Sequence, residues 1–333
     1  MPRMPSLKYF ISVAVALMPL LAPGTILADE IRAFHNTNQL PFKQIFGLPS
    51  LDNSPLTEAG KWRLNLIGNL ANTYDIATGP QEKLTNDVET FGGRLIASYG
   101  LSNKWQLSVE VPYVRHDGGF LDHFIYQWHD FFGMPQNGRT RDNGDQLNVS
   151  YLSGVSHELP GPESGIGDLR FNIAKSRAWK NRTLVFSAEV KLPTGDFDKL
   201  TGSGGTDFSA GLTLNDPHTL EKYRVTLYGG LAGVFLGSMD GELAPIQKSF
   251  VLAGRAGIGW QATKLIQLKL QLDAQSALYD SQLKELGDPA FQLLVGGSLT
   301  FTDDAYLDIA VAEDINTSTS PDVAFQLGLV LSF

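Results

Sequence analysis

The sequence predicts an all-β fold, an antiparallel up-and-down transmembrane β-barrel of about 12 strands, and three observations support this prediction. Segments of about ten residues alternate between apolar and polar side chains, as strands do when one face meets an apolar medium. The chain ends on such a segment, VAFQLGLVLSF at 323–333. Short and long connections alternate between the segments, and no run of about 18 apolar residues suggests a membrane-spanning helix.

Residues 1–28 have the pattern of a secretory signal peptide. Arg3 and Lys8 supply the positive charges, residues 9–21 form the apolar core, and Ala28 is the small residue before the expected cleavage site. The apolar run is too short to anchor the chain in a membrane. We therefore expect export through a cleaved signal peptide.

Composition excludes several classes of function. Without the two basic residues of the signal peptide, the chain has 24 basic and 35 acidic residues, which gives a net charge of −11. Such a chain is a poor partner for nucleic acid. The chain has no cysteine, which excludes disulfides, thiolate metal sites, cysteine nucleophiles and a lipid-anchored N-terminus. We expect no cofactor and no metal.

Residues 29–60 lack sustained alternation and carry three prolines and three asparagines in NTNQLPFKQIFGLPSLDNSPL. We interpret them as an irregular segment before the barrel, located either in the periplasm or in the barrel lumen. The barrel itself is expected over residues 61–333.

The strand pattern begins at Lys61 and is clearest in the hairpin whose strands cover 91–101 and 105–113. An even-stranded barrel closes by pairing its last strand with its first, here 323–333 with 61–74. Further strands are expected near 166–175, 183–192, 206–215, 223–236, 249–261, 265–275, 290–301 and 305–313.

The connections give the barrel a direction in an outer membrane. Short periplasmic turns are expected at 102–104, 178–182, 216–222, 262–264 and 302–304, and long extracellular loops at 75–86, 114–165, 193–205, 237–248, 276–289 and 314–322. Both chain ends then face the periplasm. We expect Phe333 at that rim to be recognised by the barrel assembly machinery, and the outer face to meet outer-membrane lipid and lipopolysaccharide.

Charged side chains fall on the face of the strands that points into the lumen. They could form a selectivity lining in a water-filled interior, or a self-neutralising network of ion pairs that holds a narrow barrel in shape. The candidates are Arg63, Arg94, Glu110, Asp168, Arg170, Glu189, Arg255 and Asp273.

The long loop 114–165 is the most unusual segment. Apolar residues recur at helical spacing over 121–132, and three of the six histidines lie close together. A carboxylate–histidine pair could bind a divalent cation or act as acid and base. The alternative is a short amphipathic helix on the membrane surface or in the barrel mouth. The candidate residues are His116, Asp122, His123 and His129.

Several motifs resemble known families. NQLPF at 39–43, VPYVRHDGGFLDHFI at 111–125, GIGDLR at 165–170 and LPTGD at 192–196 resemble a family of exported Gram-negative outer-membrane proteins with no assigned function. GIGDLR and LPTGD are also similar to the outer-membrane barrels named after the meta-pathway of phenol degradation. The first resemblance implies an outer-membrane location, and the second implies transport of small molecules.

The leading functional hypothesis is a passive channel or binding protein for small molecules, hydrophobic ones included, rather than an enzyme. The alternatives are an enzyme that acts on lipid or lipopolysaccharide through loop 114–165, and a structural envelope protein. No histidine stands beside a serine–glycine elbow, which argues against a serine hydrolase triad. The sequence leaves open the cargo, the oligomeric state, and whether the pore is open or plugged.

Overall fold

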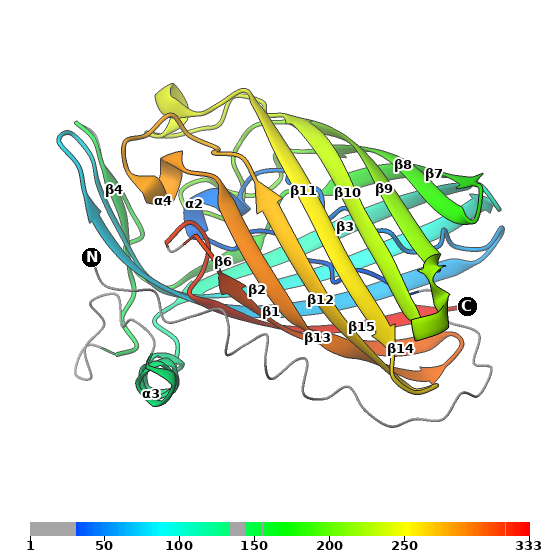
Figure 1. Ribbon diagram of the computed structural model, residues 1–333. Coiled ribbons are helices and arrows are strands. Elements are labelled where there is room, and N and C mark those ends of the chain that lie inside the picture. The colour runs from blue at the N-terminus through cyan, green and yellow to red at the C-terminus, as the bar shows by residue number, and fades with distance from the viewer. Residues whose placement is uncertain (1–30, 134–143, 155, 317) are drawn as a thin grey trace.

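The computed structural model of the protein describes residues 31–133, 144–154, 156–316 and 318–333, so the predicted signal peptide lies outside the described residues. Twelve strands form a closed antiparallel barrel (Figure 1). They are β1 (Trp62–Thr78), β2 (Lys83–Ser102), β3 (Trp105–Asp117), β7 (Arg170–Trp179), β8 (Arg182–Lys191), β9 (Asp207–Leu220), β10 (Val225–Phe235), β11 (Phe250–Gln261), β12 (Ile266–Gln275), β13 (Ala290–Thr302), β14 (Ala305–Asp314) and β15 (Val323–Ser332).

The barrel closes by pairing its last strand with its first. β15 runs antiparallel to β1 from the pair Arg63–Ser332 to the pair Asn72–Val323, and the backbone of Phe333 exchanges two further hydrogen bonds of 2.9 Å with Trp62. This closure confirms the predicted fold class and satisfies the edge that a terminal strand would otherwise expose.

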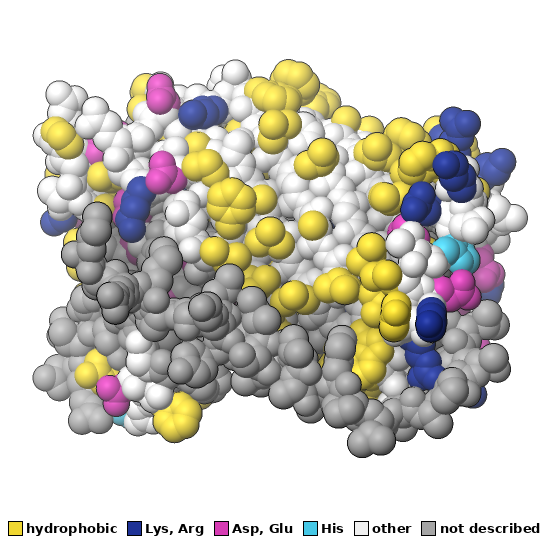
Figure 2. Space-filling view, in the orientation of Figure 1, with side chains coloured by type: hydrophobic (Ala, Val, Ile, Leu, Met, Phe, Trp, Pro, Cys, Tyr) yellow, Lys and Arg dark blue, Asp and Glu magenta, His cyan; other side chains and the backbone are white. Residues whose placement is uncertain are grey.

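Alternation along each strand separates the two faces of the wall. On β15, for example, Leu327 is 56% exposed on the outer face, whereas the neighbouring Gln326 is buried inside. Figure 2 shows apolar side chains over the middle of the outer wall, with Lys and Arg side chains gathered at the end near the short turns. Among the described residues, no helix is both long and apolar enough to cross a membrane.

The predicted loop at 75–86 was wrong in its extent. β1 continues to Thr78 and β2 begins at Lys83, so only residues 79–82 connect them. Polar residues can continue a strand above the membrane because the backbone ladder needs only a partner. Three short strands of loop 114–165 extend this sheet, namely β4 (Asn148–Leu152) on β2, β5 (Ser156–Glu158) on β4, and β6 (Glu163–Ile166) on β3.

Residues 31–57, which we call the plug, lie inside the barrel (Figure 1). The plug starts near the periplasmic end, where Ile31 lies against Gly259, and rises to the short helix α2 (Pro41–Gln44). It then descends to Thr57, whose backbone N–H donates to the Gln106 side chain at 2.7 Å. Both ends of the plug therefore lie at the periplasmic end of the barrel.

An apolar cluster, which we call the mouth cluster, packs the top of the plug against the extracellular loops. The plug contributes Phe42, Ile45, Phe46 and Leu48. The loops contribute buried side chains from the β1–β2 hairpin, β4, and the segments around α4 (Lys284–Gly287) and the 3-10 helix η2 (Ala244–Ile246). Another 3-10 helix, η1 (Glu221–Tyr223), forms part of a periplasmic turn. The extracellular mouth is thus filled by a hydrophobic core.

Because the outer wall faces lipid, a charged side chain placed on it should lower the stability of the barrel more at the middle of the membrane than near its surface. Replacing Leu327 with arginine places a cation at the middle of β15 and should lower the free energy of unfolding in lipid vesicles by about 2–4 kcal/mol. The matched variant Leu331→Arg, near the periplasmic rim, should lose only about 0–1 kcal/mol. Denaturant titration of the two variants gives the comparison, and equal losses would contradict the assignment of this face to lipid.

Candidate functional site

The plug is irregular backbone, and cationic side chains of the wall satisfy its carbonyl groups. Arg170 donates from Nη1 to the carbonyl oxygen of Leu48 at 2.9 Å and from Nη2 to that of Phe46 at 3.1 Å. Lys191 donates to the carbonyl oxygen of Ile45 at 3.2 Å. Buried carbonyl groups without a sheet partner require such donors. The wall cations therefore act as anchors for the plug.

In further anchors, one wall cation binds both a carboxylate of the wall and a carbonyl oxygen of the plug. Arg255 is bidentate to Asp273, at 2.6 Å and 2.8 Å, and also donates to the carbonyl oxygens of Asn36 and Ser50. Lys191 likewise pairs with Asp168. Each cation is thus neutralised by the wall while its remaining N–H groups hold the plug.

Lys269 repeats this arrangement close to the periplasmic end. Its Nζ lies 2.7 Å from Asp308 and donates to the carbonyl oxygen of Arg32 at 3.0 Å. A hydrogen bond to a charged group contributes about 1.5–3 kcal/mol, so several anchors together hold the plug firmly while each alone is modest.

At the top of the plug the polarity is reversed, because here the plug supplies the cation. Lys43 is fully buried and donates to the carbonyl oxygen of Thr319 in the β14–β15 loop at 2.9 Å. Burial lowers the pKa of the Lys43 amine to about 8, although nearby carboxylates, led by Asp314 and Asp75, act in the opposite direction. Lys43 is therefore a cation that is held at an electrostatic cost.

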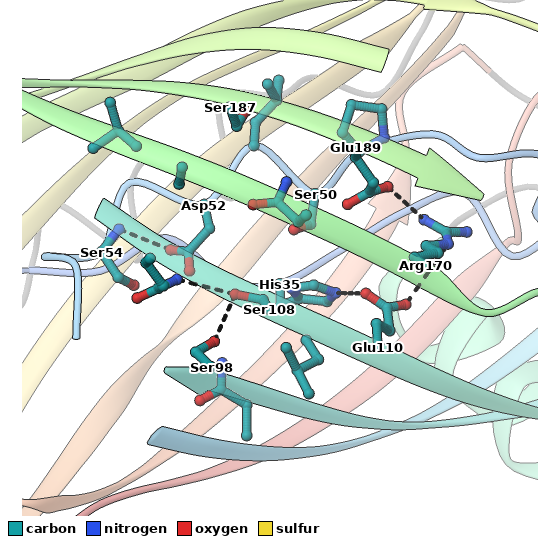
Figure 3. Close-up of a pocket in the computed structure, with 18 of the residues that line it drawn as sticks. His35, Ser50, Asp52, Ser54, Ser98, Ser108, Glu110, Arg170, Ser187 and Glu189 are labelled. Atoms are coloured by element: carbon teal, nitrogen blue, oxygen red, sulfur yellow. Dashed lines mark hydrogen bonds and ion pairs between the residues drawn. The ribbon is translucent and has the colours of Figure 1, made fainter. Parts of the chain in front are cut away.

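A polar cavity of about 80 Å³ lies between the plug and the wall (Figure 3). The plug lines one side and strands β1, β2, β3, β7 and β8 line the other, mainly with hydroxyl, carboxylate and amide groups. A cavity of this size is large enough to hold water or a small polar solute. Its labelled lining residues are His35, Ser50, Asp52, Ser54, Ser98, Ser108, Glu110, Arg170, Ser187 and Glu189.

The ion pairs around this cavity are longer than those of the anchors. Glu110 lies 3.6 Å from His35, 3.7 Å from Arg94 and 3.9 Å from Arg170, and Arg170 lies 3.9 Å from Glu189. These distances exceed the usual hydrogen-bond range. Among the described residues, Glu110 Oε1, Glu189 Oε1, Arg170 Nε and His35 Nε2 have no hydrogen-bond partner. The cavity therefore presents unused donors and acceptors to a polar molecule.

A larger cavity of about 250 Å³ opens at the periplasmic end of the lumen. Arg32 and Pro55 of the plug line it together with polar residues from the ends of β12, β13 and β14. The periplasmic end of the lumen, beside the two ends of the plug, is thus open to polar solutes, whereas the mouth cluster closes the extracellular end.

All eight predicted lumen residues lie on the inner face, with side chains that are buried or nearly so. Most of them fall into two overlapping groups. Asp168, Arg170, Arg255 and Asp273 belong to the anchors, and Glu110, Arg170 and Glu189 line the cavity. Arg94 lies 3.7 Å from Glu110 and donates to the Thr37 hydroxyl of the plug at 2.6 Å. Arg63 donates to the carbonyl oxygen of Pro55 at 2.8 Å. Whether they form a selectivity lining stays a prediction.

The candidate residues of loop 114–165 are not brought together. His116 is buried in the lumen, 3.2 Å from Gln44 and 3.0 Å from Thr90. His123 is exposed on the helix α3 (Asp122–Phe132), which confirms the predicted helical spacing. His129 also lies on α3, but its side chain is outside the described residues. No group of metal-ligating side chains occurs in the described part of the chain.

Of the two places expected for an amphipathic helix in this loop, the membrane surface and the barrel mouth, helix α3 does not occupy the mouth. Asp122 accepts a hydrogen bond of 2.9 Å from Asn72, which projects from the outer face of β1. The helix therefore lies beside the wall at the extracellular end (Figure 1). Among the described residues of the loop, only the later part, with Val149, Tyr151 and Leu159, joins the mouth cluster.

Sequence reasoning left the place of residues 29–60 open and so missed the cavity residues that the plug contributes, among them His35 and Asp52. The sequence of this segment does contain a signal for a position inside the barrel. Ile31, Phe34, Phe42 and Phe46 are large apolar residues in a segment that is otherwise polar, and all four are almost completely buried. Such residues favour a packed position over an exposed periplasmic one.

Comparisons with known proteins give a family and a fold. The family described as "Protein of unknown function (DUF3187)" matches residues 9–333. A search of the curated proteins finds no match. This family match confirms the first resemblance, whereas the resemblance to the meta-pathway barrels stays a prediction.

Among solved structures, the COG4313 outer membrane channel from Pseudomonas putida F1 is similar, with a TM-score of 0.55, 14% identity, and coverage of 84% of this chain and 98% of that one. The NanC porin has a TM-score of 0.45 and 10% identity over 81% of this chain and 98% of its own. The transport unit of the autotransporter AIDA-I from Escherichia coli has a TM-score of 0.45 and 12% identity over 82% of this chain and 90% of its own. The first likeness shows the fold of an outer-membrane barrel. With its apolar outer wall, the chain is an outer-membrane protein.

The buried lysine predicts a pH dependence of plug docking. A displaced plug returns the Lys43 amine to its ordinary pKa of 10.5, so between pH 8 and 10.5 the displaced state binds more protons than the docked one. Raising the pH through this window should therefore favour docking, by up to about 3 kcal/mol, and make the plug of the purified barrel less accessible to an added protease. Lys43→Met should flatten this dependence, and an unchanged slope in that variant would contradict the assignment.

Proposed function

The chain belongs to the DUF3187 family of proteins of unknown function, and on that premise we propose that it is a passive outer-membrane channel for small polar molecules, with the plug as its gate. The observation that carries this proposal is the occupied lumen. A polar wall surrounds a segment that is held by hydrogen bonds rather than by strand pairing. The structural neighbour from Pseudomonas putida F1 is described as an outer membrane channel, and we extend that role to this chain.

The topology of the plug supports movement. Both of its ends lie at the periplasmic end of the barrel, so it can leave the lumen on that side without unthreading. Movement would break the anchors and the contacts of four apolar plug residues in the mouth cluster, while the twelve-stranded wall stays intact.

The inner face favours polar cargo. An apolar solute would remove water from the charged groups of the wall without replacing their hydrogen bonds, which is costly. A solute with hydroxyl or amine groups could instead bond to the unpartnered atoms of Glu110 and Glu189 in the cavity. Hydrophobic cargo, included in the sequence-based hypothesis, is therefore the less favoured choice.

The alternative of an envelope enzyme is less well supported by the geometry. His116 points into the lumen, whereas His123 is exposed on α3 and bonds to Gln127 at 2.7 Å. A general base and a nucleophile need to lie within hydrogen-bond reach of each other or of a shared substrate. His116 and His123, the candidate histidines whose side chains the structure describes, do not meet this condition.

A disulfide between plug and wall tests the gate. A Cβ added at Gly47 would lie 3.0 Å from the Cβ of Asp207 and 3.1 Å from that of Lys191, so an outward shift of the plug backbone of about 0.5 Å brings the first pair to the roughly 3.5–4.5 Å of a disulfide. The native chain has no cysteine to interfere. Liposomes containing the Gly47→Cys, Asp207→Cys variant should swell in a small sugar or polyol when the protein is reduced. Swelling should stop when the protein is oxidised, because the plug cannot leave.

The single variant Asp207→Cys, which loses the same carboxylate, serves as the matched control and should not respond to oxidation. Deleting residues 31–57 should give a constant flux that no redox treatment changes. Equal flux in the oxidised and reduced double variant would show that the plug is not the gate. No flux in any variant, the deletion included, would end the channel hypothesis.

We also propose that the assembly machinery recognises the C-terminal ring. Phe333 is 62% exposed at the periplasmic rim, and its backbone is hydrogen-bonded to that of Trp62. Deleting Phe333 should reduce the amount of heat-modifiable barrel in the outer membrane several-fold, while the flux per inserted molecule is unchanged. An unchanged yield would contradict this role.

A further inference from the structure

Helix α3 packs on the outer wall across the seam where the barrel closes. Leu121 and Ile125 are buried against Val323 of β15, and the same cluster includes Leu70 of β1 and Val311 of β14. These strand residues belong to the outward-facing set, so the helix lies on the side of the wall that faces the membrane.

Polar contacts fix the start of the helix. Asp122 accepts hydrogen bonds from the Asn72 side chain at 2.9 Å and from the Asp145 backbone N–H at 2.8 Å. Glu89 of β2 accepts from the backbone N–H groups of Phe120 and Leu121, at 2.9 Å and 3.0 Å. The helix is therefore a fixed part of the extracellular rim of the barrel.

Besides the side that packs on the wall, α3 has one aromatic side and one polar side. Phe124 and Phe131 are seven residues apart, which is about two helical turns, so they share one side, and they are 48% and 82% exposed. His123 and Asp130 are also seven residues apart and exposed, on a different side. With Leu121 and Ile125 against the wall, the helix has a barrel side, an aromatic side and a polar side.

We propose that α3 is an interfacial helix whose aromatic side, Phe124 and Phe131, inserts among the acyl chains of the outer leaflet. The aromatic side is continuous with the lipid-facing wall, because the Phe124 ring lies 6.4 Å from the ring of Phe325 on the outer face of β15. Large exposed apolar residues beside such a wall have lipid as their natural partner. The polar side then faces the headgroups and water.

Spin labelling tests this position directly. Because the chain has no cysteine, single cysteines can be placed at Phe124, Phe131, His123 and Asp130, labelled, and studied in the full-length protein in phospholipid vesicles. Labels at 124 and 131 should collide more with oxygen, which concentrates in lipid, than with a water-soluble nickel complex. Labels at 123 and 130, the matched pair at the same spacing, should show the opposite order.

Two results would overturn the proposal. If all four labels favour the nickel complex, the helix stands in water. If the label at 131 is shielded from both reagents and gives dipolar broadening between molecules, a second copy of the chain covers the aromatic side instead of lipid. Retention of the heat-dependent gel shift in each variant shows that the barrel is folded, so either result bears on the helix and not on folding.

Discussion

Hydrogen bonds from wall cations to the backbone of the plug are the interaction on which the rest of the structure depends. Irregular backbone is tolerated at membrane depth only where protein or water satisfies its polar groups. Arg170, Lys191, Arg255 and Lys269 meet this requirement, and carboxylates of the wall neutralise three of them at short distance. The charges of the lumen thus have a third role beyond the two alternatives drawn from the sequence, because they hold a segment of the same chain.

The ion pairs of the lumen are of two kinds, short pairs in the anchors and longer pairs around the cavity, and the two kinds have different roles. Short pairs such as Lys269 and Asp308, 2.7 Å apart, are fully engaged and rigid. The group around Glu110 has separations of 3.6–3.9 Å and polar atoms that face a cavity. A network that is partly satisfied in this way can exchange protein contacts for solvent or solute at a small cost. The anchors therefore hold the plug in the lumen, which is the closed state, and the cavity offers polar atoms to which a solute can bind first.

Most of the barrel could be predicted, because alternation along a strand is a local property that lipid enforces on one face. The twelve strands and the pairing of the last with the first were found in this way. The helix over 121–132 was found from the helical spacing of its apolar residues. The β1–β2 hairpin was underestimated, since above the membrane nothing requires an apolar face. The candidate site was predicted only in part. The wall residues Glu110 and Arg170 were identified, but His35 and Asp52, which line the same cavity, come from a segment without periodicity.

By itself, the sequence determined the number of strands, their lumen and lipid faces and the closing pair, because each follows from the period-two pattern and from the need to satisfy every strand edge in lipid. Tertiary structure alone decided what fills the lumen and where loop 114–165 lies. Those outcomes depend on contacts between residues hundreds of positions apart, such as Lys269 with Arg32 and Gln326 with His35. No local pattern encodes such contacts, because an irregular segment takes its conformation from the surface that receives it.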